Sequence, residues 1–212
     1  VYYPNAKDLS GVGYFGFGKY KPNKSGGNKN YNAVAYRKWW HMITRCYSEK
    51  EQKKPSCKAY IGCVVCEEWH SFQNFALWCE GKEDKLVDGF EIDKDMFGDG
   101  KLYCPEYCTL LPDKVNSFLS DNYSNKVSGL PEGVNVIKPK TKNSKTGYCA
   151  RCHINGKREY LGYYNTPEEA GEVYRKAKEA EARRLAEEYK DTLTSKEYEK
   201  LKSFTLKDIH RK

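Results

Sequence analysis

The chain has 212 residues, and its 37 Lys and Arg residues against 29 Asp and Glu residues give a formal charge of +8 at pH 7. This positive excess favours a polyanionic partner, and 18 Tyr and 4 Trp residues offer flat rings on which bases can stack. No apolar run approaches the roughly 18 residues of a membrane-spanning helix, and no stretch resembles a signal peptide. We therefore expect a cytoplasmic protein without membrane contact, and the sequence leaves its oligomeric state open.

The length allows two small domains of α+β class, and shifts in composition divide the chain. They predict an N-terminal domain over residues 1–120, with a glycine-rich entry, and a polar linker over 121–129. A second domain follows over 130–190, and a helical tail occupies 191–212.

The first domain opens with glycine-rich and helical segments. Residues 11–20, GVGYFGFGKY, predict a hairpin or a close backbone approach to another segment. Residues 35–47 and 67–80 repeat apolar side chains at three- and four-residue spacing, which predicts two amphipathic helices. His41 and His70 lie beside these apolar stripes, and we interpret both as boundary residues rather than ligands.

Residues 90–116, FEIDKDMFGDGKLYCPEYCTLLPDKVN, predict a hairpin followed by a helix. The strand at 90–93 is expected to turn at residues 98–100 and to pair with a second strand at Leu102 and Tyr103. Pro112 then opens a helix. Two acids at the strand end and one amide on the helix can surround a divalent cation. The sequence thus predicts a Mg²⁺ site at Asp93, Asp95 and Asn116.

Nine cysteines without a secretory signal argue against a disulfide framework. Cys63 and Cys66 are separated by two residues, as in zinc sites, and Cys104 and Cys108 by three residues that begin with Pro105. These four residues predict a structural Zn²⁺ site. The alternative is that they serve as small buried apolar side chains.

The second domain contains three strand candidates, at residues 133–140, 147–156 and 157–166. A helix follows, with Thr166 as N-cap and Glu169 completing a capping box. One helix across a three-stranded sheet leaves one sheet face free. Alternation along the strands places basic and aromatic side chains there, which suits the major groove of duplex DNA. They are Lys138 and Lys140 at the border, and Arg151, His153, Arg158 and Tyr160 on the strands.

Two resemblances extend these predictions. Residues 11–120 resemble phage-borne relatives of the HNH homing endonucleases. The segments that carry this resemblance are WWHMITRCY, CVVCEEWHSFQNFALW, IDKD, YCPEYC and LLP. The resemblance implies a ββα-metal fold that cuts or nicks DNA with Mg²⁺, in which Asp93 precedes the general base and Asn116 binds the metal. Lys94 stands where that family has its base histidine, and Tyr107 stands where it has an asparagine. A lysine with a pKa of about 10.4 is protonated near neutral pH unless it is desolvated, so Lys94 is an unusual catalytic candidate.

Residues 130–182 resemble the Apetala-two/ethylene-response-factor DNA-binding domain. Matching segments are Gly133-Val134, Tyr148 with Ala150 and Arg151, Leu161-Gly162, and Glu168-Glu169-Ala170. The resemblance implies base contacts from the sheet, and it adds Asn135, which stands at a position of an expected arginine.

Together these features predict a DNA-binding protein of phage or mobile-element type. The sheet would locate the target, and the first domain would nick or cut it. Two alternatives stay open. One is a catalytically inactive DNA-binding regulator with the same folds, and the other is an RNA- or protein-binding scaffold in which single-stranded bases stack on Tyr148 or Tyr160.

Overall fold

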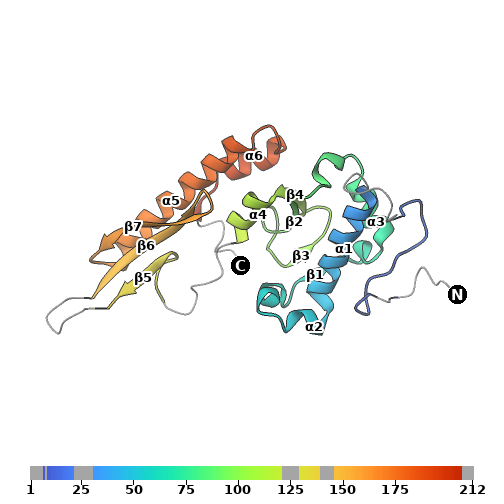
Figure 1. Cartoon of the computed structure of the whole chain (residues 1–212), viewed down its shortest axis with the longest axis horizontal. Helices are drawn as coiled ribbons and strands as arrows, with labels where there is room; N and C mark the ends of the chain where they lie inside the picture. The colour runs from blue at the N-terminus through green and yellow to red at the C-terminus, as the bar shows by residue number, and fades with distance from the viewer. Residues whose placement is uncertain (1–6, 8, 22–30, 121–128, 139–145, 207–212) are drawn as a thin grey trace. The chain divides into compact units, whose positions relative to one another are not determined.

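The computed structural model describes residues 7, 9–21, 31–120, 129–138 and 146–206. Helices and three small sheets give a mixed α+β structure, and the chain divides into two compact units, Val1–Asn116 and Ser117–Lys212 (Figure 1). The predicted linker, except for its last residue, and Lys140 lie outside the described residues. No helix in the described ranges combines the length and the apolar character needed to cross a membrane.

The core of the first unit lies between helices α1 (Tyr31–Tyr47) and α3 (Phe72–Cys79). The expected apolar stripes are confirmed as core, because Trp39, Ile43 and Phe75 are at most 2% exposed. The second stripe begins in a 3₁₀ turn at Glu67–His70, before α3 starts. The Trp39 indole Nε1 donates to the carbonyl of Trp69 at 2.7 Å, which joins the two helical segments. The other helical elements are α2 (Glu49–Gln52) and 3₁₀ turns at Pro55–Tyr60 and Glu83–Lys85.

The glycine-rich entry makes the close approach that its composition predicts. Gly18 lies so near α3 that an added Cβ would be 2.1 Å from Oε1 of Gln73. The Gln73 side-chain amide donates to the Tyr20 carbonyl at 3.0 Å and accepts from the Tyr20 N–H at 3.1 Å. A glycine at this position therefore lets the entry segment contact α3.

The predicted hairpin pairing is wrong. Strand β2 (Phe90–Asp93) pairs with β4 (Thr109–Pro112) in an antiparallel sheet, and β3 (Leu102–Tyr103) pairs in parallel with β1 (Val64–Val65). The reason lies in the segment after β2, which folds on itself instead of making a two-residue turn. A Cβ on Gly98 would lie 2.7 Å from the Lys94 carbonyl. After this segment, β3 pairs with β1 instead of with β2. The partner of β2 is β4, which leads directly into α4 (Asp113–Ser120).

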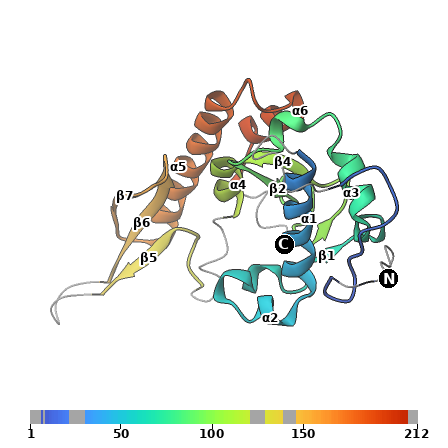
Figure 2. The same cartoon turned by 45° about the vertical axis from the view of Figure 1, so that its right-hand side comes forward.

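The second unit contains the three-stranded antiparallel sheet β5 (Val134–Ile137), β6 (Gly147–Ile154) and β7 (Lys157–Tyr164), in that order. Helix α5 (Pro167–Glu188) packs along one side of it (Figure 2). Its predicted capping box is confirmed, because the Thr166 hydroxyl accepts from the Glu169 N–H and the Glu169 carboxylate accepts from the Thr166 N–H. Helix α6 (Ser195–Lys202) follows α5 and begins with a second capping box, formed by Thr194 and Glu197.

Candidate functional site

The face of the sheet away from α5 carries three cross-strand rows of side chains. The α5 side is defined by Ala150 and Cys152, which are buried with Ala170 and Tyr174 of the helix. The opposite face follows from the strand register. Its rows are Asn135 with Cys149 and Tyr163, then Arg151 with Tyr160, then His153 with Arg158.

These rows present nitrogen-bearing and aromatic side chains to solvent. Arg151, His153 and Arg158 are exposed, and Tyr160 is 56% exposed. Asn135 is half-buried, and Lys138 is exposed just after β5 ends. The acid of β7, Glu159, is paired with Cys152 and therefore belongs to the other side of the strand. The outer face thus carries cations without an acid in its three rows.

Tyr163 belongs to this face, and sequence reasoning missed it. Strict alternation would place Tyr163 and Tyr160 on opposite sides of β7, since they are three residues apart. A β-bulge intervenes, because Ala150 pairs with Gly162 while Arg151 pairs with Tyr160, which leaves Leu161 as the extra residue. The signal was Gly162, whose φ of 127° is unfavourable for other residues.

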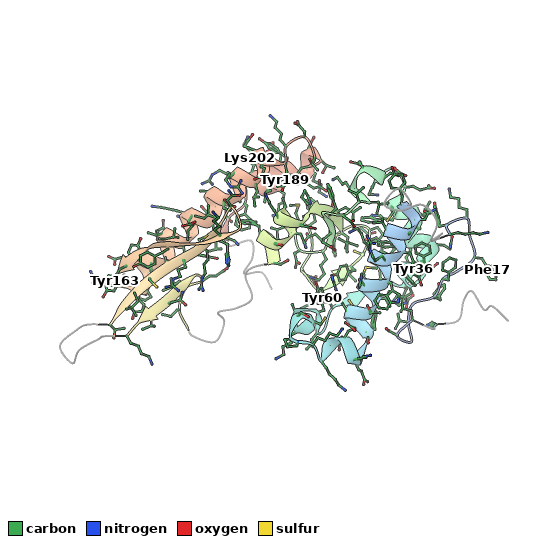
Figure 3. The ribbon with its side chains drawn as sticks, in the orientation of Figure 1. Phe17, Tyr36, Tyr60, Tyr163, Tyr189 and Lys202 are labelled. Carbon is green, nitrogen blue, oxygen red and sulfur yellow. The ribbon has the colours of Figure 1, made fainter. Side chains whose placement is uncertain are left out.

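The Tyr163 side chain (labelled in Figure 3) reaches Gly147 of the neighbouring strand β6. A Cβ on Gly147 would lie 2.0 Å from the Tyr163 hydroxyl oxygen. The ring is 51% exposed, and its cross-strand partner Cys149 is only 3% exposed. Gly147 therefore provides the space in which Tyr163 lies flat on the sheet, and Tyr163 and Tyr160 together form an aromatic edge beside Arg151.

The strand end in the first unit has a different arrangement. Asp93 is 1% exposed, and its Oδ1 accepts from the N–H of Asp95 at 3.1 Å and of Met96 at 2.7 Å. Its Oδ2 is buried and has no hydrogen-bond partner in the described part of the chain. Burial, aided by the nearby Asp95 carboxylate, raises the pKa of Asp93 to about 6. The carboxylate thus holds the loop after β2 by accepting two backbone hydrogen bonds.

Lys94 forms an ion pair with Asp95 and is not available as a general base. Its Nζ lies 3.1 Å from Oδ2 of Asp95, and its side chain is 8% exposed. Burial lowers the pKa of Lys94, but the Asp95 carboxylate and other neighbouring acidic groups outweigh it, so the pKa is raised above its ordinary value. An ammonium group with a raised pKa cannot accept a proton from water near neutral pH.

Two of the three predicted Mg²⁺ ligands, Asp93 and Asp95, are engaged in hydrogen bonds within the first unit, and the Mg²⁺ site stays a prediction. Asp95 accepts from the Lys94 ammonium group, and Asp93 retains one oxygen that is not hydrogen-bonded. Asn116 lies on α4, which begins beside the other end of β2, since the Asp113 N–H donates to the Gly89 carbonyl. Across the described ranges, no cluster of three or more His, Cys, Asp or Glu side chains has a geometry that could hold a metal.

The cysteines of the predicted zinc site are partly brought together. Parallel pairing of β1 with β3 places Cys66 beside Cys104, because the Cys66 N–H donates to the Tyr103 carbonyl at 2.9 Å. Cys63 instead directs its thiol to the carbonyls of Ala59 and Gly100. Burial raises the pKa of the Cys66, Cys104 and Cys108 thiols. Raised pKa values keep metal-free thiols protonated and do not decide between the two alternatives, so the zinc site stays a prediction.

Comparisons of the chain with protein-family models, with curated proteins and with solved structures found no match. Two arrangements therefore remain as candidates for a function: an open cationic sheet face, and a buried strand end at which Lys94 pairs with Asp95 while Asp93 Oδ2 has no hydrogen-bond partner in the described part of the chain.

Proposed function

We propose that this protein binds duplex DNA through the outer face of β5, β6 and β7. The observation that supports this most strongly is the set of three side-chain rows on the sheet face opposite α5. Adjacent strands lie about 4.8 Å apart, so three strands measure roughly 10 Å across their axes. The major groove of B-DNA is about 12 Å wide and accepts a β-ribbon.

The chemistry of the rows matches base edges and phosphates. The Arg151 and Arg158 guanidinium groups can each donate two hydrogen bonds to a guanine edge or to a phosphate. Tyr160 and Tyr163 offer apolar ring surface for thymine methyl groups, and Lys138 supplies a phosphate contact at the sheet border. Arg151 lies in the middle row of the central strand, so we assign it a base contact and expect the border cation to add affinity without sequence preference.

Selection of preferred duplexes from a random pool, followed by a fluorescence anisotropy titration, tests the proposal. Arg151→Ala should weaken binding to the preferred duplex by about 1–3 kcal/mol and relax selectivity at one base pair. Arg183→Ala is the matched control, because it removes the same charge from an exposed position on α5. Failure of the wild-type protein to bind duplex DNA would contradict the proposal, and a preference for single-stranded RNA would favour the scaffold alternative.

DNA cleavage of the HNH type is the second candidate function. The order β2, β4, α4 gives two antiparallel strands followed at once by a helix that carries Asn116. The buried Asp93 Oδ2, without a hydrogen-bond partner in the described ranges, is the observation that favours it. Nicking of supercoiled plasmid with Mg²⁺, lost in Asp93→Asn and in Asn116→Ala, would establish this activity. Tight binding without nicking would support the inactive regulator.

A further inference from the structure

The first unit contains a cleft of about 210 Å³ between α1 and the segment that includes β2. Its polar lining is formed by Arg37, Lys38, His41 and Arg45 of α1 and by Asp88 and Glu91 from the β2 side. The four α1 residues follow one another at intervals that keep them on one helical face. This face lies beside the apolar stripe, where the sequence pattern indicated only that His41 is a boundary residue.

The cations of the cleft are positioned by specific partners. Lys38 is 8% exposed, its Nζ donates to the Phe90 carbonyl, and it lies 4.0 Å from the Glu91 carboxylate. An Arg37 nitrogen lies 3.0 Å from the Asp88 carboxylate, and an Arg45 nitrogen lies 3.3 Å from the Tyr60 hydroxyl. Both groups of the Arg37 pair are more than half exposed, so a competing anion can displace Asp88 at little free-energy cost.

Charge and size limit what the cleft can accept. Three cations against two acids leave a net charge of +1 while His41 is neutral, and +2 once it is protonated. At ~30 Å³ per water, the volume holds about seven waters. Pockets for drug-sized molecules measure roughly 300–1,000 Å³, so the cleft suits one small anionic group better than a whole nucleoside.

We propose that this cleft binds a single phosphate group through Arg37, Arg45 and His41, and that duplex DNA supplies this phosphate from its backbone. Guanidinium groups donate paired hydrogen bonds to phosphate oxygens, and an imidazolium adds a third charged donor. The phosphate site itself is independent of the sheet. Only the assignment of the phosphate to DNA rests on the proposed function.

His41 reports on the bound group. Partial burial lowers the pKa of His41, Arg45 and Arg37 lower it further, and Glu91 and the Glu51 carboxylate of α2 oppose them. Lys38 and Asp88 also line the cleft, with opposite charges. A phosphate among these groups stabilises the imidazolium, so it raises the pKa of His41. By linkage, phosphate binds more tightly as the pH falls through that pKa.

An NMR pH titration of the full chain, with the His41 signal assigned from His41→Gln, tests the site. Inorganic phosphate should raise the pKa of His41 relative to chloride at equal ionic strength, and the rise should be lost in Arg45→Gln. Arg37→Gln provides a second variant at an exposed position, should loss of the Tyr60 contact perturb folding. Lys58→Gln, an exposed cation of the same unit outside the cleft, should leave the rise intact. An unchanged His41 pKa in phosphate overturns the site.

Salt dependence identifies the source of the phosphate. The measured quantity is the slope of log K against log salt for binding of the preferred duplex. Its magnitude should be smaller by about 1 in Arg45→Gln than in the wild-type protein. Lys58 lies outside the cleft, so Lys58→Gln should leave the slope unchanged. If phosphate shifts His41 but the slope is unchanged, the ligand is a free phosphate compound and the DNA assignment is wrong. If phosphate shifts His41 and no duplex binds, the proposed function fails while the phosphate site stands.

Discussion

The outer face of β5, β6 and β7 and the strand end at Asp93 both carry the charged residues that the sequence marks as functional. Their environments differ. Arg151 and Arg158 are exposed, and within the described ranges no side-chain hydrogen bond engages them. Asp93 and Lys94 are buried, accept or donate hydrogen bonds within their own loop, and have shifted pKa values. A charged residue in a sequence motif can contact a partner only where the folded chain leaves its charge available.

The most disruptive test of this comparison is Asp93→Ala. It removes the acceptor of the Met96 N–H, in a buried hydrogen bond, and of the Asp95 N–H, in a partly buried one. A buried donor that is left unsatisfied costs about 1–3 kcal/mol. We expect the free energy of unfolding in urea to fall by about 4 kcal/mol. Asp99→Ala is the matched control, because its carboxylate also accepts from two N–H groups but is exposed, so its loss should be about 1 kcal/mol. Equal small losses in both variants would refute a structural role for Asp93.

The pH dependence of stability sharpens the same point. Because the pKa of Asp93 is raised to about 6 in the folded protein from 3.8, the folded state binds more protons than the unfolded state between these values. Stability contributed by protonated Asp93 is therefore present below about pH 4 and is lost as the pH rises through about 6. The loss amounts to at most about 3 kcal/mol, at ~1.4 kcal/mol per pKa unit. Asp93→Asn should remove this slope from the urea unfolding curves, and an unchanged slope would assign it to another group.

Gly162→Ala tests the bulge that brings Tyr163 to the outer face of the sheet. A φ of 127° strains any residue with a Cβ, so we expect a stability loss of about 1–3 kcal/mol by thermal or urea unfolding. Gly156→Ala also replaces a glycine with positive φ, but in the β6–β7 turn, and it serves as the comparison. The DNA affinity of Gly162→Ala is then compared with its fraction of folded protein. If the loss of affinity is fully explained by the loss of folded protein, the bulge has no role in recognition.

Gly147→Ala should have the smallest effect on stability and a selective effect on binding. The added Cβ meets the far end of the Tyr163 ring, which can rotate away, so unfolding should change by less than about 1 kcal/mol. DNA affinity should fall by about 1 kcal/mol, the loss expected for Tyr163→Ala, and the double variant should lose no more than either alone. Additive losses in the double variant would show that the two residues act separately.

Much of the local structure could be predicted from sequence, because it depends on contacts a few residues apart. The apolar spacing of Trp39, Ile43 and Cys46 predicts α1, and the Thr166 and Thr194 capping boxes mark where α5 and α6 begin. The pairing of β2 could not be predicted, because it depends on how the loop after Asp93 folds. Tyr163 was missed because a single bulge reverses the alternation, although Gly162 was a visible signal. The cleft was missed because it needs α1 and β2 side by side.

The claim that the sheet occupies the major groove is tested most directly by methylation interference at guanine N7, an atom that is accessible only in that groove. With the preferred duplex, methylation of at least one guanine should weaken wild-type binding. The same methylation should have no effect on Arg151→Ala and an undiminished effect on Arg183→Ala. Tight wild-type binding to a guanine-containing target without interference at any guanine, or interference that persists in Arg151→Ala, would contradict the placement of Arg151 in the major groove.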